Sequence, residues 1–120
     1  MKKVLFIEDD ASLLSIYQEI LKPKDIFVVN AKTGKEGLQK VTTEKPNLII
    51  LDIMLPGGIN GFDVLEQLKI NPLTKNIPVI VLTNLDSEAD VAKKIGATDY
   101  KIKSNTSLEE ITKLIMERLA

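Results

Sequence analysis

The chain has 120 residues, enough for one domain with a proper hydrophobic core. Its 16 basic and 17 acidic residues leave a net charge of -1, which gives no general attraction to nucleic acid or to an anionic membrane. The absence of cysteine and histidine excludes disulfides, thiol chemistry, imidazole metal sites and serine–histidine catalysis within this chain.

The N-terminal segment predicts a buried strand followed by a helix. Its apolar run is too short for a signal peptide or a membrane span, so we expect a cytoplasmic protein. The strand covers Lys3–Glu8 and ends in three acids, of which Asp9 and Asp10 are the second and third. From Ala11 the apolar residues follow helical spacing, and Pro23 ends that helix.

The next elements are a strand, a short helix and a second buried strand. Ile26–Asn30 is the strand, and the pair Thr33 and Glu36 predicts a capping box at the start of the helix. Pro46 stops this helix. The continuous apolar run Leu48–Leu51 is typical of a strand that is buried on both faces, as in a parallel sheet.

A carboxylate, Asp52, follows that buried strand directly. Its simplest explanation is a cap for the next helix. However, Pro56, Gly57 and Gly58 separate it from the helical pattern that starts near Gly61. An acid at the end of a buried strand loses hydration unless a charged group meets it there, so we expect such a group nearby.

The second half of the chain continues the alternation. Its elements are a helix closed by Asn71-Pro72, a strand Ile77–Leu82, a weak helix Ser87–Ile95, a short strand Asp99–Ile102 and a last helix. We expect Val91 and Ile95 to face inward from the weak helix. Ser107 and Glu110 predict a capping box for the last helix, whose apolar stripe starts at Leu108.

Five strands alternating with five helices predict an α/β fold, a doubly wound parallel sheet with helices on both faces. We expect residues 1–120 to form this single domain. In such a sheet the C-terminal ends of all strands meet at one edge, where ligands bind.

Five polar side chains fall at that edge: Glu8, Asp9, Asp52, Thr83 and Lys103. Each alone has an ordinary explanation as a cap, a turn residue or a solvated charge. Together, clustered carboxylates repel one another and need a cation. A set of oxygen ligands without histidine or cysteine favours a hard ion such as Mg²⁺.

The same residue types suit phosphoryl transfer. A carboxylate beside Mg²⁺, with a hydroxyl and an ammonium opposite, can attack a phosphoryl group while its oxygens are neutralised. No other strong nucleophile is present in the set, which favours Asp52 as the acceptor.

These motifs resemble those of response regulator receiver domains of two-component signalling, over essentially the whole chain. The resemblance implies a flavodoxin-like strand order 2-1-3-4-5. It implies that Glu8 and Asp9, in FIEDD, bind Mg²⁺ together with Asp52 and the backbone carbonyl of Met54. Asp52, in LDIMLPG, matches the phosphoacceptor.

The resemblance also implies how such a domain works. Thr83 matches the hydroxyl residue after the fourth strand, Tyr100 the aromatic switch residue and Lys103 the family's lysine. A sensor histidine kinase or phosphotransfer protein would donate the phosphoryl group, and the domain would assist its own phosphorylation and slow dephosphorylation. Thr83 would then move toward the phosphoryl group and Tyr100 would turn inward.

By the same resemblance, the signal would leave through the face formed by the fourth helix, the fifth strand and the fifth helix. A downstream protein or effector domain would read it there. We expect no direct contact of this domain with nucleic acid or membrane, and either a monomer or a phosphorylation-dependent dimer.

The chain departs from the family pattern in two places. The loop PGGING is one residue longer than usual, and Ser104 follows Lys103 where the family usually has proline. A cis peptide bond before a residue other than proline costs about 3–4 kcal/mol, so we expect a trans bond at this position. The long side chain of Lys103 should still reach the acids.

The residues also bear on three alternative functions. A flavin or nucleotide binder would need a phosphate-binding first turn, but here that turn is EDD and repels phosphate. A Mg²⁺-dependent hydrolase with an aspartate nucleophile would need a general acid two residues on, where Met54 stands. A degenerate receiver that binds partners without phosphorylation stays open, because of Ser104 and the longer loop.

Overall fold

The computed structural model describes all residues from Met1 to Ala120. It contains one five-stranded sheet in the order β2-β1-β3-β4-β5, and every strand pair is parallel. The strands are β1 (Lys2–Ile7), β2 (Ile26–Ala31), β3 (Leu48–Leu51), β4 (Val79–Thr83) and β5 (Asp99–Ile102). The predicted fold class and strand order are confirmed.

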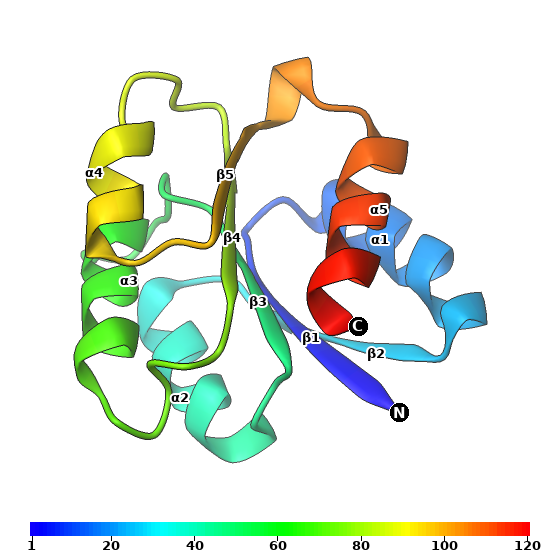
Figure 1. Cartoon of the computed structure of the whole chain (residues 1–120), viewed down its shortest axis with the longest axis horizontal. Helices are drawn as coiled ribbons and strands as arrows, with labels where there is room; N and C mark the ends of the chain where they lie inside the picture. The colour runs from blue at the N-terminus through cyan, green and yellow to red at the C-terminus, as the bar shows by residue number, and fades with distance from the viewer.

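Four α-helices connect the strands and a fifth follows β5, and together they cover both faces of the sheet (Figure 1). They are α1 (Ala11–Leu21), α2 (Gly34–Glu44), α3 (Gly61–Ile70), α4 (Ala89–Ile95) and α5 (Leu108–Leu119). Short 3₁₀ turns follow α1 and β5, at Lys22–Lys24 and Lys103–Asn105. None of the helices combines the length and the apolar character that crossing a membrane requires.

The sheet separates two hydrophobic cores. On one face α1 and α5 cover the strands, and on the other α2, α3 and α4 do so (Figure 1). Side chains of β1 alternate between the cores, so Val4 and Phe6 face α1 and α5 while Leu5 and Ile7 face the other helices. β3 alternates in the same way and is fully buried, as its apolar run predicts.

The fourth strand begins later than predicted. Pro78 has no N–H to give to the ladder, and the strand starts at Val79, two residues after the predicted start at Ile77. It continues to Thr83, which pairs with Ile102 in β5. Thr83 is therefore the last residue of the strand, not the first residue after it.

The fourth helix also begins later, at Ala89 instead of Ser87. The prediction that Val91 faces inward is wrong, because its side chain is 45% exposed and Ala92 is buried in its place. Ile95 packs against the core as predicted. Ala92 and Ile95 are three residues apart and share a face, whereas Val91 is rotated by about 100° from Ala92.

Helix capping follows the sequence only in part. The Thr33 side chain accepts a hydrogen bond from the Glu36 N–H, as predicted, but the Glu36 carboxylate accepts from the Lys32 N–H and not from Thr33. The complete capping box belongs to α3, where the side chains of Asn60 and Asp63 each accept a hydrogen bond from the other's N–H.

The last helix begins at Leu108, and Ser107 caps it, but the predicted capping box is incomplete because the Glu110 carboxylate does not accept the Ser107 N–H. The Ser107 hydroxyl oxygen accepts the Glu110 N–H, and the hydroxyl itself donates to the Glu110 carboxylate. The helix buries Ile111, Ile115 and Leu119. Leu108 lies outside this stripe and is 40% exposed, contrary to the prediction.

Candidate phosphoryl-transfer site

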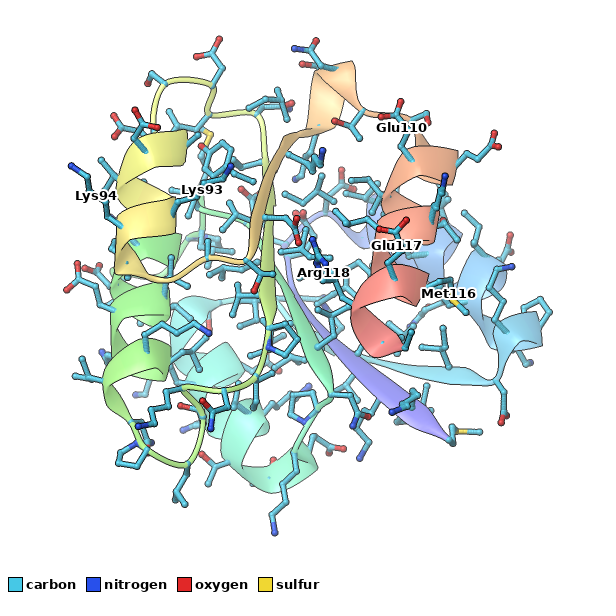
Figure 2. All side chains as sticks on the ribbon, in the orientation of Figure 1. Lys93, Lys94, Glu110, Met116, Glu117 and Arg118 are labelled. Carbon is cyan, nitrogen blue, oxygen red and sulfur yellow. The ribbon has the colours of Figure 1, made fainter.

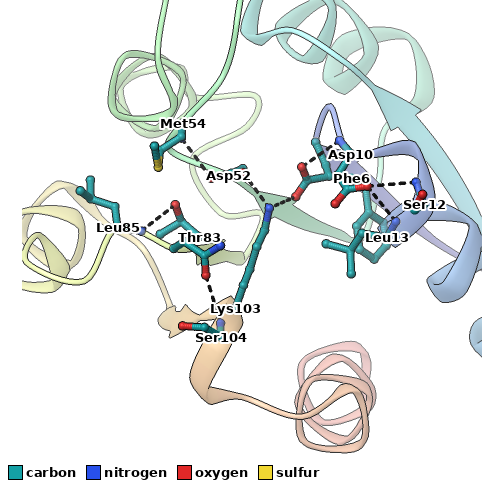
Figure 3. Close-up of polar contacts among 12 residues, drawn as sticks. Phe6, Asp10, Ser12, Leu13, Asp52, Met54, Thr83, Leu85, Lys103 and Ser104 are labelled. Atoms are coloured by element: carbon teal, nitrogen blue, oxygen red, sulfur yellow. Dashed lines mark hydrogen bonds and ion pairs between the residues drawn. The ribbon is translucent and has the colours of Figure 1, made fainter.

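An acid cluster lies where the C-terminal ends of β1 and β3 meet (Figure 3). Glu8, Asp9 and Asp52 each have a carboxylate oxygen within 4.8 Å of the others. Glu8 and Asp52 are buried, with 4% and 6% of their surface exposed, whereas Asp9 is exposed. The three acids that the sequence predicted at this edge therefore lie together.

Glu8 is held at both its backbone and its side chain. Its N–H donates to the Ala31 carbonyl at 2.9 Å, which extends the pairing of β1 with β2 by one step. One carboxylate oxygen accepts the Asp10 N–H at 3.1 Å. The Asp10 side chain caps α1 by accepting the N–H groups of Ser12 and Leu13. The Asp10 carboxylate is therefore engaged in helix capping, and Asp10 does not belong to the acid cluster.

Asp52 is fixed by the end of β3. Its N–H donates to the Ile7 carbonyl at 3.0 Å, and its Oδ1 accepts the Met54 N–H at 3.0 Å. The start of α3 packs against this backbone, because a Cβ atom at Gly61 would lie only 2.3 Å from the Asp52 carbonyl oxygen. Asn60 caps α3, so Asp52 does not have the capping role that was its simplest explanation.

Lys103 meets both buried acids. Its Nζ lies 2.6 Å from Glu8 Oε1 and 2.8 Å from Asp52 Oδ2, and the side chain is 19% exposed. The predicted reach of this lysine into the cluster is confirmed. Three carboxylates and one ammonium give a formal charge of -3 + 1 = -2. That charge and the all-oxygen donor set fit a hard divalent cation.

Burial and charge act in opposite directions on the pKa values of these groups. Burial raises the pKa of Glu8; the Lys103 ammonium and the Asp10 N–H oppose this shift, and the charge of Asp52 adds to it. Burial alone would lower the pKa of Lys103, but its hydrogen bonds and ion pairs with Asp52 and Glu8 raise it. Lys103 is therefore firmly protonated.

Thr83 and Tyr100 meet at a shared backbone residue. Thr83 is fully buried, and its Oγ1 accepts the Leu85 N–H at 3.3 Å. The Tyr100 hydroxyl donates to the carbonyl of the same residue, Leu85, and its ring packs against the core. Burial raises the pKa of Tyr100, with the nearby charges of Glu88 and Asp86 adding to the shift. The two proposed switch residues are thus linked through Leu85.

The two departures from the family pattern have clear structures. All peptide bonds are trans, so the prediction for the bond between Lys103 and Ser104 is confirmed. In the longer loop, Gly57 and Gly58 both have positive φ, 92° and 97°, which glycine adopts without strain. The side chain of Ile59 packs over Gly34, so the loop lies against the start of α2.

The sequence did not predict one contact near Lys103. The Ser104 N–H donates to Asn84 Oδ1 at 3.0 Å, across the ends of β4 and β5. The only signal in the sequence was the position of Asn84 directly after Thr83. No residue of the acid cluster lines a surface pocket, so the site is not an enclosed ligand cavity.

The strand order and helix placement define a flavodoxin-like α/β protein, with an acidic site at the C-terminal edge of its sheet. Comparison with protein families matches residues 4–116 to the response regulator receiver domain. The chain therefore belongs to that family, as the resemblance in its motifs implies, and is a receiver domain of two-component signalling.

Known relatives agree with this assignment. The chain is 38% identical over 104 residues to the alkaline phosphatase synthesis transcriptional regulatory protein PhoP of Bacillus subtilis (strain 168), covering 85% of this chain and 42% of PhoP. It spans a little under half the length of the first three curated relatives, at 42%, 46% and 45%.

Solved structures give the same answer. The BeF3-activated N-terminal receiver domain of RstA from Klebsiella pneumoniae is 30% identical and superposes with a TM-score of 0.88, covering 98% of each chain. The response regulator TrrA of Thermotoga maritima, in complex with Mg(2+)-BeF, is 27% identical with a TM-score of 0.85 and covers 99% of this chain and 100% of that one.

Proposed function

We propose that this chain, residues 1–120, is a phosphorylatable switch in which Asp52 accepts a phosphoryl group from a phosphohistidine. The donor would be a sensor histidine kinase or a phosphotransfer protein, and the exchange would take place in the cytoplasm. The observation that carries the proposal is the buried Asp52 carboxylate, with an ammonium on one oxygen and two further acids beside it. A degenerate receiver would not need this complete set.

The residues divide the chemistry among them. A carboxylate oxygen of Asp52 attacks the phosphorus atom, the phosphorus–nitrogen bond of the phosphohistidine breaks, and the imidazole nitrogen keeps the electron pair. The Lys103 ammonium, already at Asp52 Oδ2, stabilises the negative oxygens of the transferred group. The Thr83 hydroxyl accepts the Leu85 N–H, which leaves its own O–H proton to donate to a phosphoryl oxygen.

Glu8, Asp9 and Asp52 would hold Mg²⁺, together with the Met54 backbone carbonyl. The support is the donor set itself, three carboxylates within 4.8 Å with a formal charge of -2 once Lys103 is counted. The Mg²⁺ bound to TrrA supports the same choice of ion. When bound, Mg²⁺ supplies positive charge to the carboxylates and to the incoming phosphoryl oxygens.

The output would leave through the α4-β5-α5 face, to a downstream protein or effector domain. Leu85 supports this path, because it contacts Thr83 on the site side and Tyr100 in β5. On this face α4 carries the lysines Lys93 and Lys94, and α5 carries the glutamates Glu110 and Glu117, so these positive and negative side chains lie on different helices (Figure 2).

The chain would act as a monomer, or as a dimer that forms on phosphorylation. Arg118, its single arginine, forms a bidentate ion pair with Asp99 inside the chain, at 2.7 and 2.8 Å. Within one chain, this pair leaves no unpaired arginine on that face. In this proposal the domain itself contacts neither nucleic acid nor membrane.

The test is phosphorylation by a small phosphodonor, acetyl phosphate, read by intact-protein mass spectrometry. With Mg²⁺ the protein should gain one phosphoryl group. Asp52→Asn, or removal of the metal with EDTA, should abolish the gain. Asp25→Asn removes an equal charge at an exposed position with φ of 62°, which asparagine tolerates, so this control should be phosphorylated normally. A single adduct that persists in Asp52→Asn would refute the assignment.

A further inference from the structure

The turn that carries Lys103 is attached to the end of β4 by a side chain. The Ser104 N–H donates to Asn84 Oδ1 at 3.0 Å, and Figure 3 draws this bond as the dashed line that ends at Ser104. A proline at position 104 would have no N–H to give. The bond is therefore a consequence of the serine that stands where the family usually has proline.

The backbone pairing of β4 and β5 stops before the turn that carries Ser104, so only a side chain can bond to that turn from the end of β4. β4 and β5 pair in parallel as far as Thr83 and Ile102, and the chain then turns into the 3₁₀ turn Lys103–Asn105. The backbone ladder ends at that pair. Asn84 directly follows β4, and its side-chain amide oxygen accepts a hydrogen bond from the Ser104 N–H, beyond the last strand pair.

The attached turn determines where the lysine side chain starts. Lys103 precedes Ser104 directly, and its flexible stem must hold Nζ at 2.6 Å from Glu8 and 2.8 Å from Asp52. A lysine side chain has a large rotamer entropy, so a loose backbone would spread its ammonium over many positions. A fixed turn reduces that spread.

The same side chain joins two functional segments. Asn84 follows Thr83, whose hydroxyl would donate to the phosphoryl group in the proposed function, while Ser104 follows Lys103, whose ammonium lies at Glu8 and Asp52. One hydrogen bond thus continues the connection between these two segments beyond the last strand pair. Preorganised charges of this kind contribute to catalysis only when their positions are held.

We propose that Asn84 is a positioning residue for phosphoryl transfer. Its hydrogen bond with the Ser104 N–H holds the turn, and the turn holds the Lys103 ammonium at Glu8 and Asp52. This inference rests on the proposed phosphorylation of Asp52, and it assigns to Ser104 the task of donating its N–H. Asn84 touches neither carboxylate and acts through Lys103.

The test compares Asn84→Ala with Asn105→Ala, which shortens an exposed asparagine in the same turn. Loss of one hydrogen bond at this position should slow phosphorylation by acetyl phosphate by about two- to tenfold in Asn84→Ala. NMR relaxation of the Lys103 Cε should show a more mobile side chain, and the Ser104 amide should exchange faster with solvent. Asn105→Ala should match the wild type in all three measurements.

A conservative variant separates positioning from simple stability. Asn84→Asp keeps an acceptor oxygen, so it should restore the Ser104 protection and the Lys103 rigidity. If Asn84→Ala lowers the melting temperature but leaves both Lys103 mobility and phosphorylation rate unchanged, the bond is only structural and the inference is wrong.

The two proposals can fail separately. A wild-type protein that takes up no phosphoryl group would overturn the proposed function. Lys103 relaxation is measured without phosphodonor, so it tests the positioning role of Asn84 even in that case. A Lys103 side chain that is more mobile in Asn84→Ala but not in Asn105→Ala supports the role, and unchanged mobility in Asn84→Ala refutes it.

Discussion

Lys103 supplies the positive charge in a site that otherwise holds three carboxylates. Its ammonium lies between two buried carboxylates, at 2.6 Å from Glu8 and 2.8 Å from Asp52. Without it these acids would face each other at the end of the sheet with no positive partner. An ion pair broken on one side leaves an uncompensated buried charge, which is strongly destabilising.

Replacing Lys103 with methionine, a neutral side chain of similar length, should therefore destabilise the metal-free protein. We expect a loss of about 2 kcal/mol in the free energy of unfolding, less than the loss for a fully buried pair because Lys103 is 19% exposed. Millimolar Mg²⁺ should stabilise this variant more than the wild type, since the cluster then lacks its only ammonium.

Urea denaturation with and without Mg²⁺ measures this, and Lys101→Met, two residues earlier in β5, serves as the control. Equal stability of Lys103→Met and wild type without metal would contradict the prediction.

Tyr17 is a buried titratable group outside the site. Burial raises the pKa of Tyr17 to about 12. In the unfolded state the pKa of Tyr17 is lower, near 10. Below about pH 10 the Tyr17 hydroxyl is therefore protonated in both states, and its full contribution to the free energy of unfolding is present. That contribution is lost as the pH rises from about 10 to about 12, because the unfolded state ionises first. The loss is on the order of 3 kcal/mol.

Tyr17→Phe should flatten this part of the stability profile. The ring stays in place, including its packing against Phe6 with ring centroids 5.1 Å apart, so the stability near pH 7 should change little. Denaturant unfolding at a series of alkaline pH values measures the difference. If both proteins lost stability in parallel over that range, the lysines and not Tyr17 would be responsible.

At the scale of elements, α4 differs from its neighbours. It has seven residues, no side-chain hydrogen bond at its N-terminus, and one buried residue, Ala92. Such a short helix has few inward-facing positions, and Val91 and Ala92, about 100° apart, compete for one of them. The small Ala92 faces the core, so a pattern that favours the larger apolar residue failed for Val91. It failed as well for Leu108, at the first position of α5.

The strands and the strand ends were predictable for a different reason. Continuous apolar runs identify strands buried on both faces, and a parallel sheet brings their C-terminal ends together whatever lies between them. Glu8, Asp52 and Lys103 were therefore placed from the sequence alone. Asn84 was not, because a side-chain contact between two exposed loop ends leaves no periodic pattern.

The junction of β3 and α3 gives an element-scale prediction. At Gly61 a Cβ would lie 2.3 Å from the Asp52 carbonyl oxygen and 2.5 Å from the Ile53 Cα, both backbone atoms. Gly61→Ala should therefore push α3 away from the site, with a loss of about 3 kcal/mol in unfolding free energy. It should also slow the phosphorylation of Asp52.

Gly58→Ala is the matched control. A Cβ at Gly58 meets nothing within 4 Å, but its φ of 97° is strained for alanine, so a smaller loss of about 1–2 kcal/mol is expected. Denaturant unfolding and acetyl phosphate kinetics compare the two. Similar phosphorylation rates in both variants would show that Asp52 tolerates a displaced helix.

For the whole molecule, the link through Leu85 predicts where phosphorylation is felt. Thr83 and Tyr100 each bond to its backbone, and α4 has few buried contacts to resist movement. Phosphorylated and free protein should then differ in amide exchange over residues 84–104. The surface of α2 and β2, which lies away from this path, provides the internal control.

Amide hydrogen exchange read by mass spectrometry or NMR tests this directly. If the changes stayed within the loops that carry Asp9 and Asp52, the chain would store a phosphoryl group without transmitting a signal.

The residues of the site fall into two separate halves of the sequence. All three acids come before residue 53, while the hydroxyl and the ammonium come after residue 82. A single cut between Lys75 and Asn76, both exposed, would therefore yield one fragment with the nucleophile and another with its cation. Neither piece holds a complete site. Uptake of a phosphoryl group would then report reassembly of the two halves, which makes this receiver a natural starting point for a split-protein sensor.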